Sequence, residues 1–153
     1  MRTVLGGLAV LLAAGCSDSS PCSSCPKIEG RYLLSYEPVT IASPDCAALP
    51  APAGQPLVEI TRGGAEVRAT LYGNPGRGVL TDTSDFSISA AEPPDGGSDA
   101  GTQSYTLRGY YLPPTLRGAD GGEPAKILGK WITHGESGAK ICDAERPFTG
   151  VRQ

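Results

Sequence analysis

The chain has 153 residues, with 13 basic and 16 acidic side chains and a formal net charge of −3. This mild, unclustered acidity argues against a nucleic-acid partner, because phosphates demand a basic surface. Glycine (21 residues) and proline (14 residues) are abundant, whereas methionine and tryptophan occur once each. Such a composition is typical of short strands joined by turns rather than of helices, and the length suits one domain with its own core.

The first residues have the pattern of an export signal. Arg2 supplies a positive start, Val4 to Ala14 is an uncharged apolar run, and small residues lead into Cys16. The run is too short to span a bilayer as a mature helix. We therefore expect residues 1–15 to be removed as a signal peptide.

The segment Leu12-Ala-Ala-Gly-Cys16 resembles the lipobox of bacterial lipoproteins, with Ala13 where leucine is commoner. The resemblance implies cleavage before Cys16, a diacylglycerol on its sulfur and an acylated amine. Two or more acyl chains hold a protein stably on a membrane, so we expect a cell-envelope protein that is lipid-anchored outside the cytoplasm. Ser17 lacks the acidic inner-membrane retention signal, which favours the outer membrane. Ordinary secretion is the alternative, because it uses similar small residues at the cleavage site.

Residues 16–27 are small and polar and contain two prolines. They cannot bury much apolar area, so we interpret them as the lipidated cysteine followed by a disordered tether. Residues 28–153 are expected to form a single domain.

Within this domain, apolar residues recur at every second position between turn residues, as in half-buried strands. Gly63-Gly64 predicts a hairpin, and Asn74-Pro-Gly76 and Gly135-Glu-Ser-Gly138 are interpreted as turns. Glycines within the strands, such as Gly109 and Gly129, are expected to relieve crowding where the sheet coils sharply. The predicted strands are residues 28–36, 57–61, 65–72, 78–81, 85–90, 103–112, 125–134 and 147–152.

These strands predict an all-β fold, an antiparallel meander of about eight short strands that forms a small closed or nearly closed barrel. A β-sandwich is the alternative. Gly30-Arg-Tyr32 resembles the Gly-x-Trp start of lipocalin-like barrels, with Tyr32 in place of the tryptophan.

Besides Cys16 the chain has four cysteines, and an even number in an exported chain predicts two disulfides with three connectivities. We favour Cys46–Cys142, which closes a long loop, together with Cys22–Cys25. Cys22-Ser-Ser-Cys25 also has the spacing of a thiol redox motif, but no helix is predicted after it to activate a thiol. A zinc site would need a second closely spaced cysteine pair, so no metal is expected.

No catalytic constellation emerges from the sequence, and we expect neither an enzyme nor a cofactor. His134, the only histidine, ends a predicted strand, and Ser137 lies in the predicted turn that follows rather than in a nucleophile elbow. The Asp- and Gly-rich loops offer calcium-like oxygens but match no calcium-binding loop.

The expected function is therefore binding or structural. The barrel, or its loop end, would bind a protein partner or a small apolar ligand, with Tyr32, Tyr105 and Trp131 lining the cavity. The alternative is a packed interior with an outer surface that serves in assembly.

Overall fold

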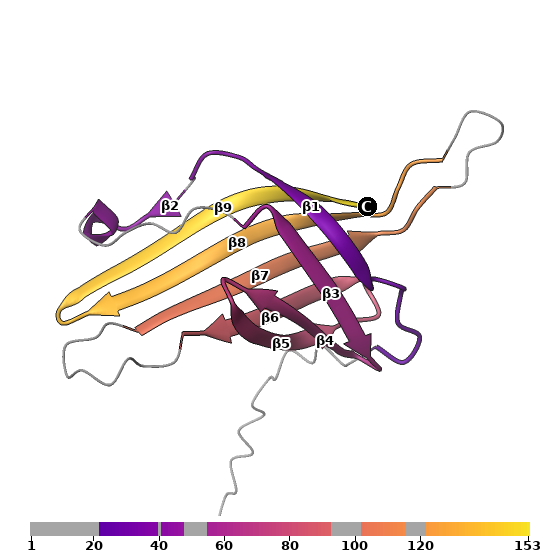
Figure 1. Cartoon of the computed structure of the whole chain (residues 1–153), viewed down its shortest axis with the longest axis horizontal. Coiled ribbons are helices and arrows are strands. Elements are labelled where there is room, and N and C mark those ends of the chain that lie inside the picture. Colours follow the sequence, from indigo (N-terminus) through magenta and orange to yellow (C-terminus); the bar gives the residue numbers. More distant parts are fainter. Residues whose placement is uncertain (1–21, 40, 48–54, 93–101, 116–121) are drawn as a thin grey trace, which may run out of the picture.

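In the computed structural model, which describes residues 22–39, 41–47, 55–92, 102–115 and 122–153, the chain is all-β. Eight antiparallel strands form a closed barrel (Figure 1), as the sequence predicts. They are β1 (Gly30–Tyr36), β3 (Leu57–Gly63), β4 (Glu66–Leu71), β5 (Asn74–Leu80), β6 (Asp85–Ala91), β7 (Thr102–Leu112), β8 (Lys126–Ser137) and β9 (Lys140–Arg152). A two-residue strand, β2 (Ile41–Ala42), and a 3₁₀ helix, η1 (Pro44–Ala47), lie between β1 and β3. No helix in the described ranges is long and apolar enough to cross a membrane.

The barrel closes through β1. From β3 to β9 each strand pairs with the next one in the sequence, which makes a meander. β1 then pairs with both ends of this meander, placing Leu33 beside Leu57 of β3 and beside Val151 of β9. Because both edges of β1 are paired, the sheet is a barrel and not a sandwich.

Side chains at alternate positions fill the interior, as the period-2 pattern predicts. On β4, for example, Val67, Ala69 and Leu71 are buried, while Arg68 and Thr70 face solvent. Thr133 is the only buried polar residue among those described, and the buried tyrosines and Trp131 add hydroxyls and an indole nitrogen. The largest fully buried side chains of the core are Tyr32, Ile28, Ile60, Leu71, Leu80, Ile88, Leu107, Ile127, Val58 and Val67.

The turn predicted at Asn74-Pro-Gly76 is wrong by two residues. The β4–β5 turn is Tyr72-Gly73, whose backbone φ angles are 49° and 81°, and Asn74 already pairs with Leu71 as the first residue of β5. Two consecutive positive φ angles match the twist of a tight hairpin. Tyrosine is rare in that conformation, so the pattern pointed to the nearby Asn-Pro-Gly instead. The first hairpin is correct, but its turn is Gly64-Ala65 rather than Gly63-Gly64.

The last two strands are also longer than predicted. β8 continues through His134 to Ser137, and the turn is Gly138-Ala139, with Gly138 at a φ of 61°. The predicted turn at residues 135–138 is thus mostly strand. The predicted strand 147–152 is only the second half of β9, which begins at Lys140.

The first half of β9 extends beyond β1, which pairs with β9 only from Phe148 onward. Figure 1 shows β2 lying beside this free part of β9, where Ala42 pairs with Ala144. The Cys46–Cys142 disulfide joins η1 to β9, and the Ser43 amide donates to the Asp143 carbonyl at 2.9 Å. We call residues 41–47 the strap. It covers an edge that would otherwise be open to pairing with other chains.

The segment Cys22–Ile28 closes one end of the barrel. Ile28 is fully buried, Cys22 is 8% exposed, and the Cys22 amide donates to the Leu80 carbonyl. Sequence analysis placed residues 22–27 in the tether, whereas the structure packs them against the barrel. The Cys22–Cys25 disulfide converts two thiols into an apolar group that can be buried. The polar residues around the two cysteines gave no indication of this packing.

Gly109 and Gly129 face each other across β7 and β8. A Cβ on Gly109 would collide with the Leu128 carbonyl oxygen, whereas one on Gly63 would meet nothing within 4 Å. Gly109→Ala should therefore cost at least about 1–3 kcal/mol of unfolding free energy through overpacking. Gly63→Ala is the matched control and should be neutral or stabilise by up to about 1 kcal/mol. Urea unfolding of both variants measures this, and equal stabilities would contradict the close approach of β7 and β8.

The Cys46–Cys142 bond spans 96 positions, so its removal should cost stability. We expect Cys46→Ser with Cys142→Ser to lose about 2–5 kcal/mol, because the unfolded chain regains the entropy of a long loop. Cys22→Ser with Cys25→Ser opens a far shorter loop and should cost less entropically. Thermal unfolding by circular dichroism tests both. An unchanged melting temperature in the first double variant would show that the strap contributes nothing to the fold.

Candidate functional site

The end of the barrel away from Cys22 is lined by aromatic side chains. Five rings from four strands and one turn meet there, and we call them the aromatic cluster. They are Tyr36 of β1, Tyr72 of the β4–β5 turn, Tyr105 of β7, Trp131 of β8 and Phe148 of β9.

Trp131 is the centre of the cluster and is 2% exposed. Its ring is edge-on to Tyr72 at 5.4 Å between centroids and to Tyr36 at 6.2 Å, and it is tilted against Tyr105 at 6.4 Å. Edge-to-face contacts of this kind add to the energy of burial. Arg146 is the cross-strand partner of Trp131, and its guanidinium carbon lies 6.0 Å from the centroid of the Tyr36 ring.

Two polar atoms in this cluster have no hydrogen-bond partner. They are the indole nitrogen of Trp131 and the hydroxyl of Tyr72, the only buried side-chain nitrogen or oxygen atoms in the described residues that are left unpaired. The other two hydroxyls are satisfied: Tyr36 donates to the Gln55 carbonyl and Tyr105 to the Gln103 side chain, each at 2.7 Å. The cluster thus holds two donors without an acceptor. Leaving a buried group unsatisfied costs about 1–3 kcal/mol of stability.

The backbone of Tyr72 adds to this cost. Its φ of 49° is the left-handed conformation, in which asparagine or glycine is usual at such a turn. A side chain with a Cβ pays about 1–2 kcal/mol there. The Tyr72 amide donates to the Gln55 side-chain oxygen at 2.8 Å, which holds the turn in place. The residue with the strained backbone is therefore the one whose ring packs against Tyr105 and Trp131.

The tyrosines of the cluster are proton donors at neutral pH. Burial raises the pKa of Tyr36 and of Tyr72, and the nearby charge of Arg146 only partly opposes this. Both hydroxyls therefore stay protonated. Together with the indole N–H and the guanidinium, they make this end of the barrel rich in donors.

The structure brings together only two of the three residues that the sequence assigned to a cavity. Tyr105 and Trp131 share the aromatic cluster, whereas Tyr32 lies near the capped end, where its hydroxyl donates to the Ile28 carbonyl at 2.6 Å. Sequence analysis assigned no role here to Tyr72 and Arg146. Tyr72 lies in a turn that the sequence did not predict. Arg146 precedes the predicted last strand, and only its pairing with Trp131 in the full-length β9 places it on the inner face.

Of the cysteines singled out in the sequence, four are paired as favoured, Cys46 with Cys142 and Cys22 with Cys25. Cys16 lies outside the described residues.

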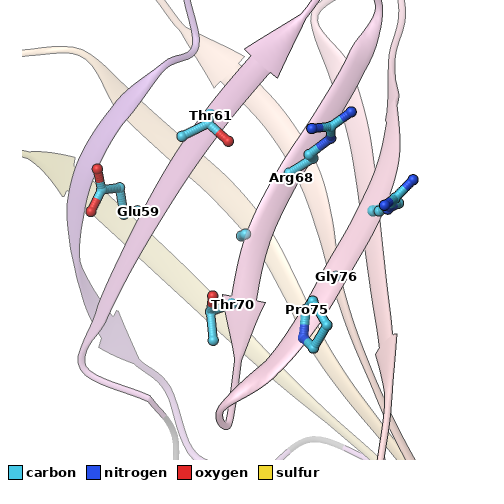
Figure 2. Close-up of a pocket in the computed structure, with 8 residues that line it drawn as sticks. Glu59, Thr61, Arg68, Thr70, Pro75 and Gly76 are labelled. Atoms are coloured by element: carbon cyan, nitrogen blue, oxygen red, sulfur yellow. The ribbon is translucent and has the colours of Figure 1, made fainter.

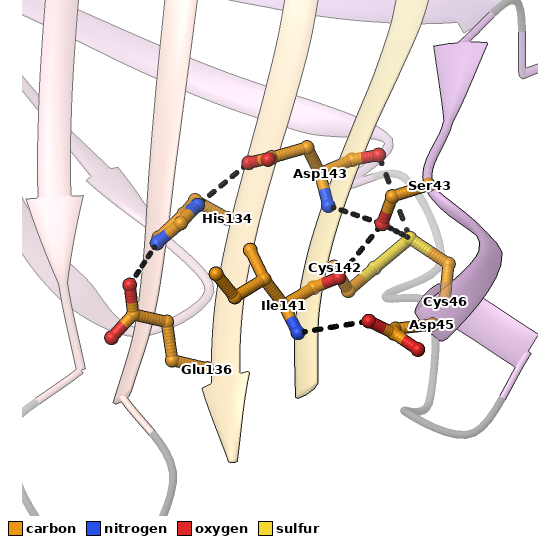
Figure 3. Close-up of polar contacts among 8 residues, drawn as sticks. All are labelled: Ser43, Asp45, Cys46, His134, Glu136, Ile141, Cys142 and Asp143. Carbon is orange, nitrogen blue, oxygen red and sulfur yellow. Dashed lines mark hydrogen bonds and ion pairs between the residues drawn. A yellow bond between two sulfur atoms is a disulfide. The ribbon is translucent and has the colours of Figure 1, made fainter. Parts of the chain in front are cut away.

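His134 sits on the outer face of the β8–β9 hairpin beside the strap (Figure 3). Its Nδ1 lies 2.6 Å from an Asp143 carboxylate oxygen and its Nε2 lies 3.0 Å from a Glu136 carboxylate oxygen. Both ring nitrogens are thus engaged, and neither is available to take a proton from Ser137. Within the described residues no group of three or more histidine, cysteine or acidic side chains is arranged to hold a metal ion.

A groove of about 270 Å³ lies on the outside of β3, β4 and β5 (Figure 2). Arg68 and Arg77 lie along it, but both side chains approach the Glu66 carboxylate, at 2.7 and 3.9 Å. The charges are therefore largely balanced and favour no particular class of ligand. The groove is lined by Glu59, Thr61, Arg68, Ala69, Thr70, Pro75, Gly76 and Arg77.

The outer face from β7 through β1 to the start of β3 carries a row of side chains that is apolar except for Lys126. Cross-strand neighbours place Leu112, Lys126, Val151, Leu33 and Leu57 in one line from β7 to β3. Tyr110 and Leu128 pair in the adjacent line. Leu33, Tyr110 and Leu112 are 40–47% exposed. Exposed apolar side chains that gather in this way mark a contact surface more often than scattered apolar residues do.

No protein-family model, curated protein or solved structure matches this chain. A barrel fold alone does not identify a function, which depends on the residues that form its sites.

The Asp143 and Glu136 carboxylates raise the pKa of His134 above its ordinary value, with the hydrogen bond to Asp143 as the larger cause. The charged imidazole should therefore stabilise the hairpin fully below about pH 6.5, and this gain should disappear as pH rises through the raised pKa. Because these groups are exposed, we expect less than about 1 kcal/mol. Since His134 is the only histidine, its NMR titration is unambiguous. Asp143→Asn should lower the pKa, and an identical titration curve would refute the contact.

Proposed function

We propose that this protein is an exported lipoprotein of the cell envelope, anchored through acylated Cys16, whose barrel has a non-catalytic binding or structural role. The observation that carries the anchor is the apolar run that ends in Leu12-Ala-Ala-Gly-Cys16. The outer membrane is the favoured location, because Ser17 does not provide an acidic retention signal.

The two disulfides support export, since such bonds persist in oxidising compartments. The position of Cys22 supports a barrel held close to the membrane. Only six residue steps separate Cys16 from Cys22, and an extended chain of that length spans about 20 Å. With the capped end tethered this closely, the apolar row through Leu33 and Leu112 is the wall that we assign to the bilayer surface, with Tyr110 as an interfacial aromatic residue.

A non-catalytic role is supported by the contacts of the only imidazole, because both of its nitrogens are engaged by carboxylates. His134 is held between two carboxylates on the outer face, away from the aromatic cluster. The donors of that cluster are tyrosine, tryptophan and arginine, which bind and orient a ligand more readily than they transfer protons at neutral pH.

A second candidate function is that the barrel carries a small, largely apolar ligand at its aromatic end. The two unpaired donors of Trp131 and Tyr72 favour it, because the other hydroxyls of the cluster have found partners within the chain.

The anchor is tested by the intact mass of the protein extracted from the envelope. We expect a chain that begins at Cys16 and is heavier by its acyl groups, and that takes up alkylating agent at four cysteines only after reduction. Cys16→Ala should lack the acyl mass, whereas Ser17→Ala is the matched control and should keep it.

A wild-type chain without acyl groups, cleaved at another residue, would make the protein freely secreted. Alkylation of Cys22 and Cys25 before reduction would contradict the disulfide at the capped end and restore the redox interpretation of that pair.

A further inference from the structure

We propose that the aromatic cluster binds a small molecule that joins a flat apolar body to an oxyanion, such as an aromatic carboxylate or sulfonate. The proposal deepens the second candidate function and rests on it, because it specifies the chemistry of the ligand at that end of the barrel. It does not depend on acylation of Cys16.

Two buried donors without an acceptor and one arginine define the polar part of the site. The indole nitrogen of Trp131 can only donate, and the buried hydroxyl of Tyr72 has nothing to donate to. Arg146 is the cross-strand neighbour of Trp131 and forms no ion pair with any described carboxylate. Each of these groups can donate to an oxyanion, and hydrogen bonds to a charged acceptor are the strongest of their kind.

The rings define the apolar part. Tyr72 and Tyr105 lie 4.7 Å apart with their planes tilted by 41°, and each also faces Trp131. Tyr36 and Tyr72 are only partly buried, so they form the rim at which a ligand would enter. Flat apolar groups pack against such rings by offset stacking or edge contacts.

The charge of Arg146 sets the sign of the ligand. Aromatic clusters of this composition often hold cations against ring faces, but here Arg146 already occupies that position over Tyr36. A second cation would be repelled by Arg146, and it would leave both unpaired donors unsatisfied. An anion is attracted by Arg146 and can accept hydrogen bonds from the donors.

The geometry of Tyr72 supports a binding role over simple packing. A tyrosine in a left-handed turn with an unpaired hydroxyl weakens the free protein in two ways. Phenylalanine would remove the unpaired hydroxyl, and asparagine would suit the turn. An acceptor on a ligand would remove the cost of the unpaired hydroxyl, while the cost of the backbone conformation places this ring in the cluster.

The test uses the mature chain, residues 16–153, with Cys16→Ser so that neither acyl groups nor detergent compete. The probes are anilinonaphthalene sulfonate and its neutral analogue phenylnaphthylamine, which lacks the sulfonate. Trp131 is the only tryptophan, so its emission reports a probe bound on or near the barrel, and the variants then locate the site. We expect the sulfonate to bind at least about tenfold more tightly than the neutral probe, as for a charge-assisted hydrogen bond.

Variants locate the effect. Arg146→Gln should weaken sulfonate binding about tenfold and leave the neutral probe within about twofold. Tyr72→Phe should weaken the sulfonate several-fold without lowering the melting temperature, because it removes an unsatisfied group. Arg77→Gln, on the outer groove, is the matched control and should change neither affinity.

Each contrary result overturns the proposal. Equal affinities for the two probes, or equal losses in Arg77→Gln and Arg146→Gln, would show that no oxyanion site exists. Binding that leaves Trp131 emission unchanged would place the probe elsewhere. No binding, together with a Tyr72→Phe variant that melts higher, would identify the cluster as packed core with a bound water at most. None of these results bears on the acyl anchor, which the mass measurement tests alone.

Discussion

The pairing of β1 with both β3 and β9 is the constraint on which the rest of this structure depends. Without it the chain would be an open meander with two exposed edges, each a template for pairing with other chains. With it, alternate residues of all eight strands face one enclosed core. Closure of so few strands also forces sharp coiling, and Gly109 opposite Gly129 is where two strands come too close for any side chain.

Closure leaves the edge of the first half of β9 unpaired by β1, and the strap covers this edge. β8 and β9 pair along their whole length, but β1 reaches only the second half of β9. The remaining edge is covered by two residues of β2 and by η1, a segment too short to hold its place through hydrogen bonds alone. The Cys46–Cys142 disulfide fixes it there. The bond thus protects a sheet edge, in addition to its effect on the unfolded chain.

The sequence was sufficient for the barrel because closure rests on alternation, and alternation is visible in residues such as Val67, Ala69 and Leu71. It was insufficient where structure depends on tertiary context. A tyrosine at positive φ has no sequence signature, so the Tyr72-Gly73 turn was missed, and with it a member of the aromatic cluster. The strap has no periodicity, and Cys22 is buried as part of a disulfide within a segment whose polar composition predicts a tether. Arg146 could be placed inside only through its register with Trp131.

The two ends of the barrel repeat one arrangement with a single difference. At each end an arginine lies near the face of a tyrosine: Arg152 is 5.8 Å from the Tyr32 ring and Arg146 is 6.0 Å from the Tyr36 ring. At the capped end the chain itself supplies oxygen acceptors, because Tyr32 donates to the Ile28 carbonyl and Arg152 to the Lys27 carbonyl. At the aromatic end Tyr36 likewise donates to the Gln55 carbonyl, whereas Trp131 and Tyr72 have no acceptor among the described residues. The segment Cys22–Ile28 therefore supplies acceptors at one end, whereas two buried donors at the other end stay unpaired within the described residues, and the proposed ligand site rests on this difference.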